Sequence, residues 1–262
     1  MVDGELNPAF DANLLSRIED AGLNASAPPQ QRWLDGWLVR YAPGKAKRAR
    51  CVNAVATGRT PVADRLDECA QLFDAAKLPL IVRVTPFTLP PGLDALLASQ
   101  GMRHFDDTRV MVLAEMPAFG ALTDPTLTIQ PIGIEAFTRR VGSFRGTPLA
   151  QRQAHAERLL NAPVPFFAFE LHADGAPVAC GQFALEGDLV GLYDVFTAES
   201  VRGRGLARAL CMHLLSQARA RGARHAYLQV KGDNAAARRV YHRLGFTDAY
   251  AYHYRTRDPS AA

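Results

Sequence analysis

The sequence Arg-Gly-Arg-Gly-Leu-Ala occupies residues 202–207, between two segments of different periodicity. The segment before it, residues 189–197, is apolar and rich in β-branched residues, which predicts a strand. The segment after it, residues 206–221, carries apolar residues at helical spacing. Two glycines therefore stand where a strand leads into the first turn of a helix. Backbone N–H groups at such a junction lack intrahelical partners and carry the positive end of the helix dipole, so the stretch is suited to bind a phosphate.

Two common phosphate-binding motifs do not fit this stretch. The sequence contains no Gly-x-x-x-x-Gly-Lys-Ser/Thr run, and Gly-x-Gly-x-x-Gly fails because Arg208 stands at the third glycine position. The pattern that fits is Arg/Gln-x-x-Gly-x-Gly/Ala, with Arg202, Gly205 and Ala207 at its fixed positions. In this respect the chain resembles the GNAT superfamily of acetyl-CoA-dependent N-acetyltransferases.

A second segment resembles the same superfamily. Residues 225–230 predict another strand, after which Asn234 begins a helix that carries Tyr241 and ends at Gly245-Phe246. Asn234 is a favourable N-cap, and Gly245 is a favourable residue just past a helix end. The two signatures follow each other in the order and at the separation that GNAT proteins have.

The resemblance implies a fold and an activity. The fold is α/β, of the α+β GNAT type, with a mixed, mostly antiparallel sheet flanked by helices. The activity is N-acetyltransfer from acetyl-CoA to a primary amine, directly within a ternary complex. The resemblance assigns the thioester and pantetheine to the backbone of Val195, Phe196 and Thr197. It assigns the diphosphate to the N–H groups of Arg202, Gly203, Arg204, Gly205, Leu206 and Ala207.

Three side chains are candidates for the chemistry. Tyr241 is the candidate general acid, because a phenol of pKa about 10 can protonate a thiolate whose acid has a pKa of about 8.5. Its alternative role is packing beneath the cofactor. Asp194 is a candidate base, but a carboxylate near its reference pKa of about 3.9 suits that task only if burial raises the pKa or water relays the proton. An acceptor-binding or structural role for Asp194 stays open, and Glu170 and Glu186 are weaker alternatives. Asn234 is expected to bind pantetheine, to cap its helix, or both.

The first half of the chain resembles a degenerate copy of the second. Gly58-Arg59 aligns with Gly203-Arg204, and Gly101-Met102 aligns with Gly245-Phe246. Pro61 removes one backbone N–H from the first-half loop. Pro90 and Leu97 stand where the second half has Asn234 and Tyr241. This arrangement is similar to that of tandem GNAT families, in which one half is active.

We therefore expect residues 1–116 to form a degenerate GNAT-like domain, 117–125 a linker and 126–262 the catalytic domain. Each half has residues for only one long strand after its aligned glycine, whereas a GNAT fold has two. Those strands are expected at residues 109–115 and 250–254. Our hypothesis is that the two halves pair around these end strands, each supplying an edge that the other lacks.

Composition excludes several classes of protein. The chain has 262 residues, 48% of them hydrophobic, which is enough for one large or two modest domains. No run of about 18 apolar residues occurs, so no membrane span is expected. The four scattered cysteines and the absence of a signal-peptide core predict reduced thiols in a cytoplasmic protein. The histidines lack ligand spacing, so no metal is expected. The basic cluster at residues 45–50 predicts a solvated loop, and we expect no nucleic-acid partner.

The acceptor is the least constrained feature. We expect a small-molecule or peptide amine, bound by residues 132–165, and a monomer or a homodimer. Arg139, Arg140 and Arg145 indicate either an acidic acceptor group or a solvated helix face. Two alternative functions stay open: a non-catalytic acyl-CoA-binding or regulatory module, and an acyltransferase that uses a different acyl donor.

Overall fold

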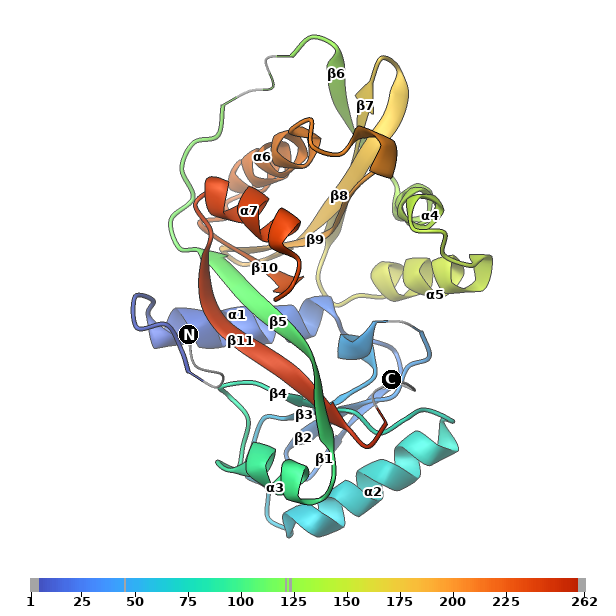
Figure 1. Cartoon of the computed structure of the whole chain (residues 1–262), viewed down its shortest axis with the longest axis vertical. Helices are drawn as coiled ribbons and strands as arrows, with labels where there is room; N and C mark the ends of the chain where they lie inside the picture. The colour runs from blue at the N-terminus through green and yellow to red at the C-terminus, as the bar shows by residue number, and fades with distance from the viewer. Residues whose placement is uncertain (1–4, 45, 121, 123, 259–262) are drawn as a thin grey trace.

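The computed structural model describes residues 5–44, 46–120, 122 and 124–258, and these residues contain one eleven-stranded sheet with helices packed against it (Figure 1). The strand order is β1-β2-β3-β4-β11-β5-β10-β9-β8-β7-β6. The strands are β1 (Gln31–Leu34), β2 (Trp37–Arg40), β3 (Val52–Ala54), β4 (Val82–Val84), β5 (Arg103–Leu113), β6 (Leu127–Ile132), β7 (Phe166–Ala173), β8 (Ala176–Glu186), β9 (Leu189–Thr197), β10 (His225–Lys231) and β11 (Thr247–Thr256). The helices are α1 (Ala12–Ala25), α2 (Val62–Ala75), α3 (Leu93–Ser99), α4 (Ile134–Phe144), α5 (Leu149–Leu160), α6 (Leu206–Arg219) and α7 (Ala235–Arg243), with short 3-10 turns η1 (Lys47–Ala49) and η2 (Glu199–Val201).

The two halves of the chain exchange their last strands at the centre of the sheet. β5, from the first half, lies between β10 and β11 and is antiparallel to both. β11, from the second half, lies between β4 and β5 and is antiparallel to both. In Figure 1 the two long strands run side by side through the middle of the molecule. Each half thus completes its part of the sheet with a strand of the other, which confirms the hypothesis of shared end strands.

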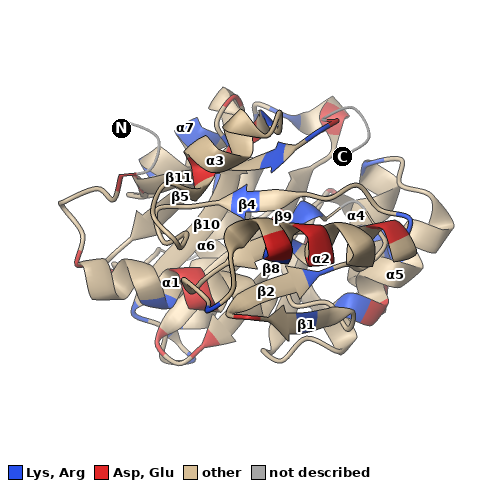
Figure 2. Cartoon of the chain, turned by 90° about the horizontal axis from the view of Figure 1, so that it is seen from below, with Lys and Arg blue, Asp and Glu red and all other residues tan. Residues whose placement is uncertain are grey.

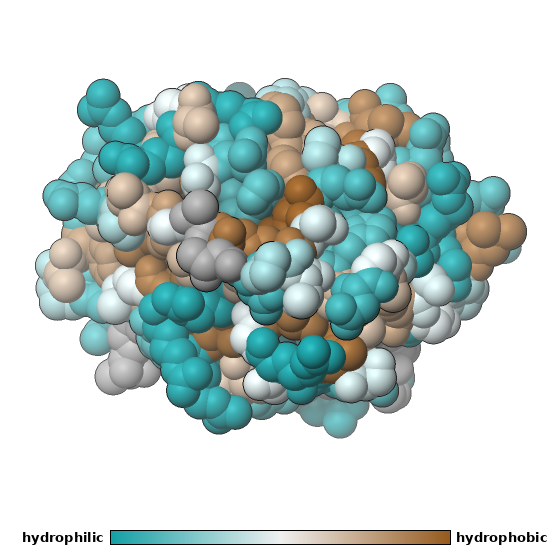
Figure 3. Space-filling view, turned by 90° about the horizontal axis from the view of Figure 1, so that it is seen from above, coloured by the Kyte–Doolittle hydropathy of each residue, from teal (hydrophilic) through white to brown (hydrophobic). Residues whose placement is uncertain are grey.

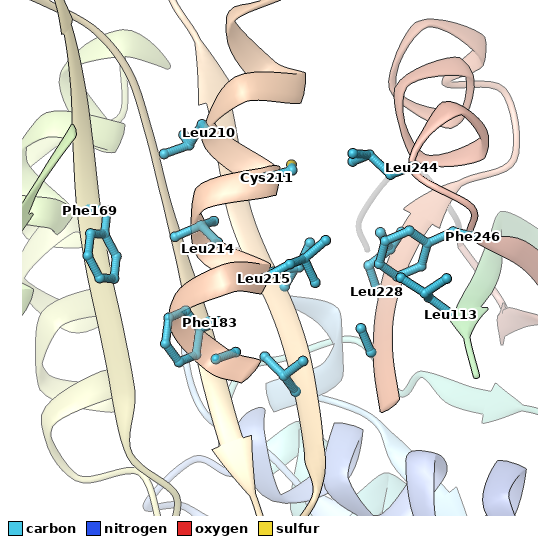
Figure 4. Close-up of a cluster of buried hydrophobic side chains, with 14 of the residues drawn as sticks. Leu113, Phe169, Phe183, Leu210, Cys211, Leu214, Leu215, Leu228, Leu244 and Phe246 are labelled. Atoms are coloured by element: carbon cyan, nitrogen blue, oxygen red, sulfur yellow. The ribbon is translucent and has the colours of Figure 1, made fainter. Parts of the chain in front are cut away.

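The hydrophobic core of the second half also contains first-half residues. Leu210, Cys211, Leu214 and Leu215 of α6 are fully buried in a cluster that α7 and the sheet complete (Figure 4). Leu113 of β5 belongs to the same cluster. Burial of each large aliphatic side chain contributes about 1.5–3 kcal/mol. The first half therefore stabilises the helix that begins at the 202–207 stretch.

A buried ion pair ties the strand exchange together. Arg83 of β4 donates to both carboxylate oxygens of Glu19 on α1, with 3.1 Å between Nη2 and Oε2. Tyr250 of β11 donates to Glu19 Oε2 at 2.7 Å, and the Arg83 guanidinium lies 3.9 Å from the centroid of the Tyr252 ring. Burial by itself would raise the pKa of Glu19, but the charge and hydrogen bonds of Arg83, with the bond from Tyr250, lower it. This network links one strand of each half to α1.

The predicted elements agree closely with the observed ones. The strand at 189–197 has the predicted limits, and the helix expected over 206–221 is observed at 206–219. The largest difference is the first-half end strand, which begins at Arg103 and ends at Leu113, and was expected at 109–115. The expected solvated loop at 45–50 is also wrong in part, because residues 47–49 form η1 and Arg48 is partly buried. Lys45 lies outside the described residues.

Acidic and basic residues are interspersed over the face seen from below (Figure 2). The face seen from above mixes hydrophilic residues with small apolar areas (Figure 3). Within the described ranges, no helix is long and apolar enough to cross a membrane. The four cysteines are free and buried.

Candidate active site

The stretch at residues 202–207 forms an open loop before α6. Gly203 and Gly205 have φ angles of 81° and 78°, in the left-handed region that glycine adopts at little cost. Ala209 donates the first bond of the helix, to Gly205 O at 3.1 Å. In the described part of the chain, no acceptor lies within hydrogen-bond distance of the N–H groups of residues 203–208. A Cβ placed on either glycine would meet no described atom within 4 Å. The loop therefore presents consecutive free N–H groups to open space.

The strand that leads to this loop separates from its neighbour. β9 and β10 pair in parallel only up to Leu192 and Leu228. Beyond that pair β9 stays bonded to β8 but has no described partner on its other side. A β-bulge lies at the point of separation, where Asp194 has a φ of 50°. Bulges redirect side chains and end pairing, and here the bulge leaves one edge of residues 193–197 free. The Thr197 hydroxyl, buried and without a partner among the described groups, lies on the same segment.

Tyr241 and Asn234 both belong to α7. Asn234 is the N-cap, and its Oδ1 accepts from Ala237 N at 3.1 Å. Tyr241 packs edge-on against Phe246, with 6.1 Å between the ring centroids. Burial, with a smaller contribution from Cys211, raises the pKa of Tyr241. Its hydroxyl has no hydrogen-bond partner among the described residues. The phenol therefore stays protonated at neutral pH and is free to donate.

A cavity of about 590 Å³ lies on the other side of the bulge, between α4, α5 and two loops of the first half. The second half contributes Gln182, Tyr193 and Asp194, together with residues of α4 and α5. The first half contributes residues 25–26, 28–30, 42–44, 46 and 48–49. This volume lies within the usual range of small-molecule sites. The cavity is therefore a candidate acceptor site that both halves build.

Asp194 is the centre of a polar network in this cavity. Its carboxylate accepts from Arg145 Nη1 at 2.9 Å and from Gln182 Nε2 at 3.0 Å, and it lies 3.2 Å from His155 Nε2. Burial by itself would raise the pKa of Asp194, but the bonds and charges of His155 and Arg145 hold it well below its usual range. Asp194 is thus a stable carboxylate at neutral pH and is poorly suited to take a proton from an ammonium group.

The structure separates the three arginines that suggested an acidic acceptor. Arg145 lines the cavity, whereas Arg140 pairs with Glu170 and Arg139 is exposed. Glu170 pairs with Arg140 and also lies 2.9 Å from His172 Nε2. Neither Glu170 nor Glu186 lines the cavity. Of the three candidate carboxylates, Asp194 is the one that lines the cavity.

Sequence reasoning missed several residues of the cavity, among them Arg48, His155 and Gln182. Arg48 is in the basic cluster that was expected to be solvated, and it lies 5.8 Å from the centroid of the Tyr193 ring. His155 and Gln182 approach Asp194 from α5 and β8, more than ten residues away in sequence. No local pattern marks such residues, because the fold alone brings them together. Within the described residues, no group of three or more His, Cys, Asp or Glu side chains could hold a metal ion.

Comparisons with known proteins agree with this geometry. Residues 15–255 match the protein family described as "Probable histone acetyltransferase Rv0428c C-terminal". An uncharacterised N-acetyltransferase of Bacillus subtilis, YobR, is 24% identical over 86% of this chain and 91% of its own length. The solved GCN5-related N-acetyltransferase of Kribbella flavida superposes with a TM-score of 0.71 at 20% identity, covering 93% of this chain and 95% of that one.

Two further comparisons concern parts of the chain. A tandem GNAT protein of the clavulanic acid biosynthesis pathway superposes with a TM-score of 0.59 at 14% identity, over 75% of this chain and 70% of that one. A mycothiol acetyltransferase of Amycolatopsis mediterranei is 47% identical over 23% of this chain and 21% of its own length.

Fold and comparisons together define a GNAT-type acetyltransferase. Within that class, the chain belongs to the family of the Rv0428c C-terminal acetyltransferase domain, which matches it almost from end to end. GNAT acetyltransferases use acetyl-CoA. The free N–H groups of residues 203–208, the open space at Gly203 and Gly205 and the unpartnered Thr197 hydroxyl suit its diphosphate and pantetheine.

Proposed function

We propose that this protein transfers the acetyl group of acetyl-CoA directly to a primary amine held in the cavity beside Asp194. The observation that carries the proposal is the row of free N–H groups at residues 203–208, next to the open edge of β9. The bulge at Asp194 lies between this row and the cavity, so donor and acceptor would meet there. A direct transfer needs both substrates bound at once, on the two sides of β9.

The cradle residues hold the donor. The N–H groups of Gly203, Arg204, Gly205, Leu206 and Ala207 hold the diphosphate, while Val195, Phe196 and Thr197 hold the pantetheine and thioester with their backbone edge. The expected contribution of the Arg202 N–H is not kept, because that group donates to Glu199 O at 3.3 Å. Acetyl-CoA supplies the activated acetyl group and the thiol leaving group. Asn234 begins α7 with its cap and so fixes the helix that carries Tyr241. Tyr241 is the general acid, since its partly buried phenol keeps its proton at neutral pH.

His155 and Asp194 together handle the acceptor's proton. An alkylammonium has a pKa of roughly 10.4 and must lose a proton before its nitrogen can attack. His155 Nε2 faces the Asp194 carboxylate, and its Nδ1 has no partner in the described ranges. When Nε2–H donates to Asp194, Nδ1 is left as an acceptor, and His155 is one of the residues that line the cavity. Asp194 orients the imidazole, and His155 receives the proton.

The test combines thiol-release kinetics with two variants. With an amine that is acetylated, varying both substrates should give intersecting double-reciprocal lines, as direct transfer requires. Tyr241→Phe should lower kcat about 100-fold while acetyl-CoA affinity stays unchanged. His155→Gln should lower kcat while acetyl-CoA affinity stays unchanged. Parallel lines would indicate a covalent acetyl-enzyme and contradict the proposal. An unchanged kcat in Tyr241→Phe would reduce Tyr241 to a packing role.

Two other functions are separated by the same assay. A non-catalytic acyl-CoA-binding module would bind acetyl-CoA but release no thiol with any amine. An acyltransferase with another donor would prefer propionyl-CoA or succinyl-CoA over acetyl-CoA. The free Tyr241 hydroxyl and the built acceptor cavity favour catalysis over simple binding.

A further inference from the structure

The cavity beside Asp194 contains more positive than negative charge. Arg48, Arg145, Arg152, Arg158 and Lys231 line it, together with His155, against the carboxylates of Glu157 and Asp194. Arg145 is neutralised by Asp194, and Lys231 pairs at 2.8 Å with Asp106. The charge that remains, on Arg48, Arg152 and Arg158 against Glu157, is cationic.

Three of these guanidinium groups, those of Arg48, Arg152 and Arg158, have no carboxylate partner among the described residues; Arg152 donates through Nε to Thr147 O at 2.6 Å. Arg48 donates to Gln229 Oε1, and Arg158 donates through Nη1 to the carbonyl of Ala25 at 3.3 Å. None of the three lies within 4.0 Å of an acidic side chain. Each is partly buried. Partly buried arginines normally pair with an anion, because desolvation of a lone charge is costly. Arg48 and Arg158, one from each half of the chain, leave a place for an anion.

The cavity also contains buried hydrogen-bond acceptors. Gln182 is 0% exposed, and because a carboxylate only accepts, its amide nitrogen must be the group that faces Asp194. Gln182 Oε1 is then buried without a donor among the described groups. Gln151 Oε1, on α5, is buried without a donor as well. Both residues line the cavity. Two unpaired carbonyl oxygens next to a carboxylate match the N–H groups of an amine.

We propose that the acceptor is an amine that also carries an anionic group, with its nitrogen at Gln182 and Gln151 and its carboxylate or phosphate between Arg48 and Arg158. This inference rests on the proposed acetyl transfer. It explains why the first half is retained, since Arg48 and the Ala25 carbonyl that holds Arg158 both come from that half. Gln182 is then a specificity residue for the amine, and Arg158 is one for the anion.

The experiment compares amines that differ only in the anionic group. The pairs are γ-aminobutyrate with its amide, alanyl-alanine with its C-terminal amide, and O-phosphoethanolamine with ethanolamine. Binding is measured by calorimetry on the intact protein saturated with CoA, and acetylation by thiol release. The charged member of at least one pair should bind at least about tenfold more tightly than its neutral partner, as a charge-assisted hydrogen bond provides. Tighter binding of the charged member in either of the first two pairs identifies the anion as a carboxylate. The same preference in the third pair identifies it as a phosphate.

Single substitutions test the residues for the anion and the residue for the amine separately. Arg158→Gln and Arg48→Gln should each weaken the charged member about tenfold and leave the neutral member unchanged. Gln182→Met should weaken both members equally, because it removes an amine contact. Arg139→Gln, an exposed arginine outside the cavity, is the matched control and should change neither.

The outcomes distinguish the two proposals. Equal binding within every pair overturns the anionic acceptor. Failure of every charged member to bind at about 10 mM overturns it as well. Acetylation of neutral amines alone would also overturn it while supporting acetyl transfer. Binding of charged amines without thiol release from acetyl-CoA would contradict the acetyl transfer and leave the anionic ligand standing.

Discussion

The loop before α2 and the loop before α6 occupy equivalent places in the two halves, and their contents differ. In the first half the N–H groups of Arg59 and Thr60 donate to Asp35 Oδ2 at 2.7 and 2.8 Å, and the Thr60 hydroxyl donates to the same oxygen. In the second half the corresponding N–H groups have no acceptor in the described part of the chain. The first-half loop thus holds an anion of its own, the Asp35 carboxylate, where the second-half loop is open.

The space around the loop glycines also differs between the two halves. A Cβ on Gly58 would lie 2.4 Å from Arg65 Nη1 and 2.7 Å from Asp35 O, whereas one on Gly205 would meet no described atom within 4 Å. The hydrogen bonds from the Thr60 and Arg59 backbone hold the pKa of Asp35 well below its usual range, so this internal anion persists at neutral pH. We infer that residues 1–116 shape the acceptor cavity and do not bind acetyl-CoA.

The largest expected effect comes from blocking the open loop. Gly205→Glu should abolish acetyl-CoA binding and lower the rate of acetyl transfer at least about 100-fold, because it places a carboxylate where phosphates would bind. It also puts a side chain at a φ of 78°, which costs about 1–2 kcal/mol. Gly205→Ala carries the same backbone strain without the charge and should keep much more activity. Steady-state kinetics on both variants measures the effect; equal loss in the two would show that strain, and not charge, is responsible.

Breaking the buried ion pair should lower stability. Arg83→Met leaves the Glu19 carboxylate buried without its partner, which costs about 3–5 kcal/mol. Because α1, β4 and β11 meet there, both halves should unfold together at the lower temperature in calorimetry. The double variant Glu19→Leu/Arg83→Met should recover most of the loss. Two separate transitions in Arg83→Met would show that the halves fold independently despite their exchanged strands.

A matched pair of charge reversals compares the two loops directly. Arg204 and Arg59 stand at aligned positions and both are exposed. Arg204→Glu should weaken acetyl-CoA binding about tenfold, by removing one favourable charge and adding an unfavourable one beside the diphosphate. Arg59→Glu should leave the affinity unchanged. Calorimetric titration of the two variants gives the comparison, and a similar loss in both would mean that the first half also attracts the cofactor.

The smallest expected effect concerns acid stability. Asp35 has a lowered pKa in the folded protein, so its contribution to stability is present above its unfolded pKa of about 3.9 and is lost as pH falls through its folded pKa. Asp35→Asn should therefore lower Tm at neutral pH and match the wild type more closely as the solution is acidified. Activity should not change. The measurement is Tm as a function of pH in both proteins, and a constant difference at every pH would contradict the role of the Asp35 charge.

The sequence predicted the elements better than it predicted the site. Residues 189–197 and 206–219 were recognisable because periodicity and a glycine pair are local signals. The exchange of β5 and β11 followed from counting too few strands in each half. Local patterns could not predict the bulge at Asp194, because it depends on strand register. Tertiary packing alone brings together the cavity residues His155, Gln182 and Arg48. The Asp35 carboxylate was missed for the same reason, since it reaches its loop from a hairpin more than twenty residues earlier.

The stoichiometry of acetyl-CoA binding tests the central claim most directly. Isothermal titration of the intact protein should give about one acetyl-CoA per chain, and Gly205→Glu should bind none. Two equivalents per chain, or one equivalent that persists in Gly205→Glu, would place a cofactor site in the first half and contradict the account.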